Sequence, residues 1–193
     1  MLKPNGYDEA KESGFASVDL GGHYAVIKRV EERTSKTGKP MIAVGIDFIA
    51  PDRQAEYFTN VFENDDRPDK KWPHKAMSYV MVQDYQNPGI TSRNFKTFCT
   101  SFEKSNNCEI QWGGSNWAGQ FTGKKIGVVY GEVENEYNGE FSMREQIRWF
   151  CSWDSVKTAK VPKPKYLEDA PSAGSATQTA STIPAFDDST VPF

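Results

Sequence analysis

Met41-Ile42-Ala43-Val44-Gly45-Ile46-Asp47-Phe48 is the stretch that decides the fold class of this 193-residue chain. Its large apolar side chains recur at every second position, which is typical of a β-strand with one buried face. A second run upstream, residues 23–31, is rich in Tyr, Val and Ile, so we expect another strand there. The segment between them, residues 32–40, contains Gly38 and Pro40 and predicts a turn. Two strands joined by a turn indicate a mainly β protein.

The remaining chain adds three predicted strands and two predicted helices. We expect the third strand over 56–63, a short helix over 74–84, a second helix over 91–104, and the last two strands over 124–134 and 143–153. The second helix carries an apolar stripe at i, i+3, i+4 and i+7, formed by Phe95, Phe98, Cys99 and Phe102. This order predicts a five-stranded OB-fold barrel with a helical insertion between strands 3 and 4. The alternative is a β-rich sandwich with two surface helices.

Composition divides the chain into four parts. Residues 1–20 indicate a polar N-terminal arm and 21–157 the folded barrel, whereas 158–185 indicate a flexible linker rich in Pro, Ser, Ala and Thr. Residues 186–193 form a separate tip, so the predicted C-terminal tail is disordered. All 23 lysines and arginines lie at or before Lys165, and the net charge of the chain is −3. A charge split between body and tail favours contact with nucleic acid.

Other classes of protein have little support in the sequence. Cys99, Cys108 and Cys151 are odd in number and lack CxxC spacing, so we expect reduced thiols in a cytoplasm, without a disulfide framework or metal. We expect no signal peptide and no membrane span. Neither His23 nor His74 accompanies a nucleophile or a metal-binding motif, and no phosphate-binding loop is present. We therefore expect no enzyme activity and no cofactor.

The last eight residues, Phe186-Asp187-Asp188-Ser189-Thr190-Val191-Pro192-Phe193, are the most specific motif. An apolar ring at the end of a polar linker gains nothing from a core of its own. A partner protein can instead hold the Phe193 ring in an apolar pocket and pair cations with the carboxylates. The predicted partner-binding residues are Phe186, Asp187, Asp188, Val191, Pro192 and Phe193.

This tip resembles the C-terminal end of bacterial single-stranded DNA-binding proteins, an acidic patch that closes in Ile-Pro-Phe. Val191 replaces the Ile, and the acidic patch is reduced to Asp187 and Asp188. The segment Ser35-Lys36-Thr37-Gly38-Lys39-Pro40-Met41 is similar to the loop between the first two strands of phage and mobile-element members of that family. The resemblance implies an OB-fold that coats single-stranded DNA during phage or bacterial replication, recombination and repair. It further implies a tail that recruits host or phage proteins of those pathways, in the bacterial cytoplasm.

Sequence-tolerant binding of single-stranded DNA needs cations along the backbone and rings for base stacking. The candidate cations lie on the predicted strands and the first loop: Lys28, Arg29, Arg33, Lys36, Lys39, Arg144 and Arg148. The candidate rings are Tyr57, Phe58, Phe62, Trp72 and Phe150. Each ring could belong to the core instead, and each isolated cation could be ordinary surface. The pairs Phe58/Phe62 and Tyr57/Val61 lie on opposite faces of the predicted strand, and the sequence leaves open which faces inward.

A second function keeps the tail and omits the DNA-binding groove. In that alternative the chain is a protein-interaction module that diverts host repair or replication proteins by mimicking the tail. Charge reversal at Arg144 and Arg148 separates the two, because only DNA binding needs these cations. We expect Trp149 and Trp153 in the core. The sequence leaves open a homo-oligomer, the preference between DNA and RNA, and the identity of the tail's partners.

Overall fold

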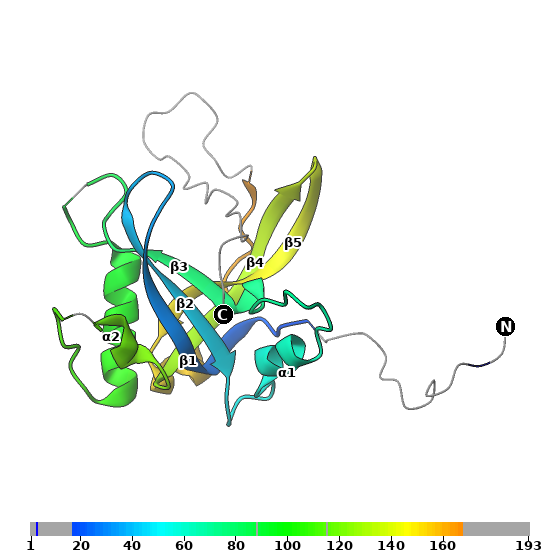
Figure 1. Cartoon of the computed structure of the whole chain (residues 1–193), viewed down its shortest axis with the longest axis horizontal. Helices are drawn as coiled ribbons and strands as arrows, with labels where there is room; N and C mark the ends of the chain where they lie inside the picture. Colours follow the sequence, from blue (N-terminus) through cyan, green and yellow to red (C-terminus); the bar gives the residue numbers. More distant parts are fainter. Residues whose placement is uncertain (1–2, 4–16, 88, 115, 168–193) are drawn as a thin grey trace.

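A five-stranded antiparallel sheet is the main element of the computed structural model, which describes residue 3 and residues 17–87, 89–114 and 116–167 (Figure 1). The strands are β1 (Gly21–Thr34), β2 (Pro40–Phe48), β3 (Met77–Met81), β4 (Lys125–Tyr137) and β5 (Glu140–Cys151). Their order is β3-β2-β1-β4-β5, and the edge strands β3 and β5 are not hydrogen-bonded to each other, so the sheet is not closed. The prediction of a mainly β fold is confirmed. The predicted tip at 186–193 lies outside the described residues.

Two α-helices and three short 3-10 helices complete the described chain. They are α1 (Tyr57–Glu63), η1 (His74–Ala76), α2 (Arg93–Asn106), η2 (Ala118–Phe121) and η3 (Trp153–Thr158). Helix α2 lies between β3 and β4, as expected, and begins after Ser92, whose Oγ accepts a hydrogen bond from the N–H of Phe95 (3.1 Å). Its predicted stripe of Phe95, Phe98, Cys99 and Phe102 is buried. The Phe98 ring packs on Phe150 of β5 and Phe121 of η2, which joins the helix to the sheet.

The predicted third strand over 56–63 is wrong, because this segment forms α1. The carboxylate of Asp47, at the end of β2, accepts hydrogen bonds from the N–H groups of Phe58 (2.9 Å) and Thr59 (3.2 Å). These amides belong to the first turn of the helix, which has no partner for them within the helix itself. Phe58 is fully buried, and its ring centroid lies 5.0 Å from that of Phe48. The helix is thus attached to the end of β2 by both a cap and a core contact.

The third strand is β3, within the segment predicted as a helix over 74–84. It pairs antiparallel with β2 from Met41↔Met81 to Gly45↔Met77. A short apolar run has no period that separates a strand from a buried helix turn. Pairing with the free edge of β2 therefore decides that residues 77–81 form a strand.

β4 and β5 form a hairpin that projects from the body of the domain (Figure 1). Both strands are longer than predicted, because the connection between them consists of Asn138 and Gly139 alone. These two residues have positive φ angles of 52° and 81°. Such angles are required by the two-residue turns that match the twist of a hairpin.

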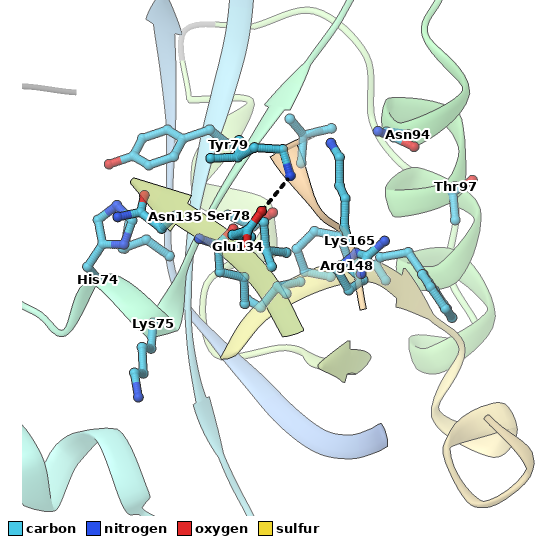
Figure 2. Close-up of a pocket in the computed structure, with 18 of the residues that line it drawn as sticks. His74, Lys75, Ser78, Tyr79, Asn94, Thr97, Glu134, Asn135, Arg148 and Lys165 are labelled. Atoms are coloured by element: carbon cyan, nitrogen blue, oxygen red, sulfur yellow. Dashed lines mark hydrogen bonds between the residues drawn. The ribbon is translucent and has the colours of Figure 1, made fainter. Parts of the chain in front are cut away.

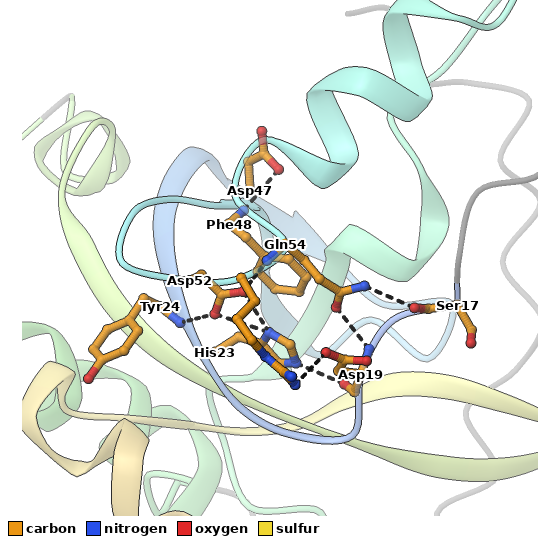
Figure 3. Close-up of polar contacts among 9 residues, drawn as sticks. Ser17, Asp19, His23, Tyr24, Asp47, Phe48, Asp52 and Gln54 are labelled. Carbon is orange, nitrogen blue, oxygen red and sulfur yellow. Dashed lines mark hydrogen bonds and ion pairs between the residues drawn. The ribbon is translucent and has the colours of Figure 1, made fainter. Parts of the chain in front are cut away.

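The end of the predicted N-terminal arm is attached to the sheet around a buried histidine (Figure 3). Nε2 of His23 donates to the carbonyl oxygen of Asp19 (2.8 Å), and Nδ1 lies 3.1 Å from the carboxylate of Asp52. The side chain of Gln54 accepts from the N–H of Asp19 (2.9 Å) and donates to the carbonyl of Ser17 (2.9 Å). Ser17 and Asp19, which fall in the predicted arm, are therefore hydrogen-bonded to the sheet domain.

Asp52 gives the domain a pH-dependent stability. Burial raises its pKa, but hydrogen bonds from His23 and from the N–H groups of Gln54 and Tyr24 outweigh burial, so the net pKa lies below the usual 3.8. A carboxyl group with a lowered folded pKa stabilises the protein above its unfolded pKa, and this contribution disappears as the pH falls through the folded value. We expect the free energy of unfolding to fall more steeply between about pH 5 and pH 2 in the wild type than in Asp52→Asn.

Urea unfolding over a pH series measures this difference. Asp154→Asn, at an exposed position on η3, is the matched control and should keep the wild-type slope. Equal slopes for the wild type and Asp52→Asn would contradict the expectation.

The first residues of the predicted flexible linker are packed on the sheet. Lys165 forms a parallel bridge with Val133 of β4: its N–H donates to the carbonyl of Glu132 (3.0 Å), and its carbonyl accepts from Glu134 (2.8 Å). The N–H of Leu167 donates to the carboxylate of Glu134 (3.0 Å). Lys165 and Leu167, which fall in the predicted linker, are therefore hydrogen-bonded to β4. None of the helices in the described ranges is long and apolar enough to cross a membrane.

Candidate nucleic-acid interface

The side of the sheet opposite the core carries three rows of side chains across β1, β2 and β3. The register aligns Arg29, Gly45 and Met77 in one row, Glu31, Ala43 and Tyr79 in the next, and Arg33, Met41 and Met81 in the third. Directly paired residues of antiparallel strands lie on the same face. The intervening Ile42, Val44 and Val80 are buried in the core, so the three rows point away from it. We call these nine residues the outer face.

The accessible part of the outer face comes from β1 and β3, whose six residues in it are all half-buried. The residues that β2 contributes are covered: a Cβ on Gly45 would lie 3.1 Å from Sδ of Met77. Tyr79 is half-buried and stands in the middle row. On β1, Arg29 and Arg33 both pair with Glu31, and Nε of Arg33 lies 3.0 Å from its carboxylate. Two guanidinium groups against one carboxylate leave this strand with a net positive charge.

A first group of rings and cations lies at a β-bulge in β1. The register shifts between Ile27 and Arg29, so Lys28 is the extra residue. Nζ of Lys28 lies 5.8 Å from the ring centroid of Trp72, and Nζ of Lys70 lies 4.9 Å from that of Phe62. The two rings are 5.6 Å apart. We call Lys28, Phe62, Lys70 and Trp72 the bulge cluster; the structure thus brings together three predicted residues from three separate segments.

Trp72 is fixed against the sheet while part of its ring stays accessible. Its Nε1 donates to the carbonyl oxygen of Ile46 in β2 (3.2 Å), and the ring is half-buried. Tyr57 lies deeper, against Phe48 and Phe58. Burial and the negative charge of Glu145 raise the pKa of Tyr57, so its hydroxyl stays protonated at neutral pH.

A second group lies at the other end of β2, in the loop before it. Nζ of Lys39 lies 4.0 Å from the ring centroid of Tyr85 and donates to the carbonyl oxygen of the same residue (3.1 Å). The Tyr85 side chain is 57% exposed, and Lys36 is exposed at the loop tip. We call Lys36, Lys39 and Tyr85 the loop cluster. It offers an accessible ring beside two cations.

Five predicted site residues lie neither in the two clusters nor on the outer face: Tyr57, described above, and Phe58, Phe150, Arg144 and Arg148. Phe58 is fully buried and Phe150 is 4% exposed, so both rings belong to the core and cannot stack on a base. Arg148 donates to the carbonyls of Glu132 (3.2 Å) and Lys163 (3.1 Å) and fastens the C-terminal segment to β4. Arg144 is exposed on the projecting hairpin.

Sequence reasoning missed Tyr79 and Tyr85 and placed one tryptophan wrongly. Tyr79 was missed because a helix was expected over 74–84, although the alternation of Tyr79 with Val80 fits a strand. Tyr85 lies in a loop, where no periodicity indicates its exposure. Trp149, expected in the core, is 39% exposed, whereas Trp153 packs on Tyr24 with 4.6 Å between ring centroids.

The open seam between β3 and β5 is bridged by side chains. It holds a cavity of about 320 Å³ lined by β3, β4, β5 and the C-terminal segment, with Arg148 and Lys165 in its wall (Figure 2). Nζ of Lys75 in η1 lies 2.6 Å from the carboxylate of Glu145 in β5. The buried hydroxyl of Tyr130 donates to the carbonyl oxygen of Lys75 (2.7 Å). These contacts connect η1, which directly precedes β3, to β4 and β5 without backbone pairing.

Within the described ranges, no group of three or more His, Cys, Asp or Glu side chains is placed to hold a metal ion. Burial raises the pKa of Cys99 and of Cys151 to about 11, so both remain protonated thiols at neutral pH. No protein-family model matches the chain, and no curated protein matches it significantly. Function is therefore inferred from the outer face and its two clusters.

Proposed function

We propose that this chain is a sequence-tolerant single-stranded DNA-binding protein with an OB-fold and no catalytic activity. An OB-fold is a five-stranded, partly open Greek-key barrel that binds oligonucleotides on its β2–β3 face and adjacent loops. The order β3-β2-β1-β4-β5, with α2 between β3 and β4, agrees with that topology. The gap between β3 and β5 corresponds to the opening of such a partly open barrel.

The observation that carries the proposal is the spacing of rings and cations along β2. The loop cluster lies at Lys39, Tyr79 is paired with Ala43, and Trp72 is hydrogen-bonded to Ile46. Lys39 and Ile46 are seven positions apart, which at about 3.3 Å per position of extended chain gives roughly 23 Å. This length suits several nucleotides, and an OB-fold engages about 4–16 of them. Every base has a stacking face, so rings set among cations give binding without sequence preference.

The biological role follows from the predicted tail. We propose that the protein coats single-stranded DNA in phage or bacterial replication, recombination and repair, in the cytoplasm. The tip at 186–193 would recruit the proteins of those pathways by inserting Phe193 into an apolar pocket. The packed segment ending at Leu167 supports a division between a DNA-binding domain and a recruiting tail. It attaches the start of the tail to β4 and not to β2.

Titration with labelled oligo-dT and with duplex DNA over a salt series tests the proposal. We expect oligo-dT to bind much more tightly, to quench tryptophan fluorescence, and to weaken with salt by a slope of about −0.7 per neutralised phosphate. Duplex DNA cannot offer free base faces to Tyr79 and Trp72. Equal affinity for both forms of DNA would overturn the proposal.

Truncation separates recruitment from DNA binding. A chain lacking Pro192 and Phe193 should bind oligo-dT as the full chain does, and should lose capture of host replication and repair proteins. Ser189→Ala is the control, because it leaves Pro192 and Phe193 in place. Tail-dependent capture without oligo-dT binding would favour the alternative, an interaction module that mimics the tail.

A further inference from the structure

A groove of about 680 Å³ runs along α2 and shares no residue with the outer face, the bulge cluster or the loop cluster. Arg93, Lys96, Thr97, Thr100 and Lys104 line it at i, i+3, i+4, i+7 and i+11, which places them on one face of the helix. The opposite wall comes from the end of β5 and from η3, with Ser152 and Ser155.

The charge of this groove suits a phosphate backbone. Three of its lining side chains are cations, Arg93, Lys96 and Lys104, and all three are exposed. The one acid among its lining residues is Asp84, whose carboxylate accepts the N–H groups of Gln86 (2.9 Å) and Asn87 (3.0 Å). Cations and hydroxyl groups are the usual protein contacts of phosphodiester oxygens.

An adjoining groove adds a stacking surface. It has a volume of about 940 Å³ and shares Thr91 and Lys96 with the first groove. Trp112 lines it with a 63% exposed side chain and stacks on Trp117, with ring centroids 5.8 Å apart and an interplanar angle of 26°. Gln120 fixes the loop: it accepts from the N–H of Gln111 (2.9 Å) and donates to the carbonyl of Trp117 (2.8 Å). The exposed indole is thus held in place before any ligand arrives.

We propose that the two grooves, which we call the α2 track, bind a further stretch of the same DNA strand. Phosphodiester groups contact Arg93, Lys96 and Lys104, and a base stacks on Trp112. This inference rests on the proposed function. The path is continuous, because Arg33 and Pro40 line the Trp112 groove and stand at the base of the β1–β2 hairpin, beside the loop cluster. A strand leaving the outer face over this hairpin therefore meets the α2 track.

Oligonucleotide length separates the two surfaces. We compare oligo-dT of about 8 nucleotides, which fits the outer face, with oligo-dT of about 30, beyond the usual site size of one OB-fold. Lys96→Glu/Lys104→Glu should leave the affinity for the short oligonucleotide unchanged and lower the affinity for the long oligonucleotide about tenfold. Its salt slope for the long oligonucleotide should fall by about 1.4, at about 0.7 per lost phosphate contact. Trp112→Ala should likewise lower the affinity for the long oligonucleotide and leave the affinity for the short one unchanged.

The matched control is Lys124→Glu/Lys160→Glu, two exposed lysines that line neither groove. Thermal melting checks that each variant is folded. The inference is overturned if the track variants bind the long oligonucleotide as the control does, which is also the result if a protein partner occupies the grooves. If the wild type fails to bind even the short oligonucleotide, the proposed function itself fails, and the two failures are distinct.

Discussion

Tyr79→Ala should weaken binding of a short oligo-dT between about fivefold and 150-fold, since a stacked base contributes about 1–3 kcal/mol. The ring stands in the middle row of the outer face, opposite Ala43 and between the two clusters. Its removal leaves the inward neighbour Val80 in the core, so β3 keeps its packing. Fluorescence titration against oligo-dT of about 8 nucleotides measures the loss.

Two controls make this result specific to stacking. Tyr79→Phe keeps the ring and should bind nearly as the wild type does. Tyr137→Ala removes an exposed tyrosine from the end of β4, outside the outer face, and should have little effect. An unchanged affinity in Tyr79→Ala would remove the central ring from the proposed interface.

Asp47→Ala should have the largest effect on stability, lowering the free energy of unfolding by about 2–4 kcal/mol. The carboxylate is 3% exposed and accepts from the N–H groups of Phe48, Phe58 and Thr59 and from the Thr59 hydroxyl. Alanine leaves these donors buried without their acceptor and removes the cap of α1. Because Phe62 of the bulge cluster lies on this helix, binding of oligo-dT should weaken as well.

Urea unfolding measures the change, with two comparisons. Asp47→Asn keeps one acceptor oxygen and should lose less stability than the alanine variant. Asp69→Ala, at an exposed position, should unfold at the wild-type midpoint. If Asp47→Ala also unfolds at that midpoint, the carboxylate does not hold α1 to β2.

Periodicity predicted the elements whose amphipathic pattern is long. β1, β2, β4, β5 and α2 were found this way, and each of them is at least nine residues long. It failed at α1 and β3, which have seven and five residues. Their conformations depend on distant partners: the cap of α1 comes from Asp47, and β3 takes its form from the edge of β2. Neither partner is visible in the local sequence.

The sequence predicted the types of side chain in the candidate site, but it did not predict which individual residues lie together there. Lys28 and Trp72 are far apart in the sequence, and only the fold brings them to the bulge cluster. Phe58 and Phe62 share one side of α1, yet the first is fully buried and the second half-buried. The depth of each ring depends on how α1 sits on β2. A pattern of residue types cannot give that depth.

The bridge at Lys165 determines where tension on the chain end would act. If a bound partner pulls at the tail, the load passes from Leu167 and Lys165 into the backbone of β4. That strand is hydrogen-bonded to β1 on one side and β5 on the other, so traction is shared by the whole sheet. A force applied to the tail would therefore leave the register of the strands that carry the outer face unchanged.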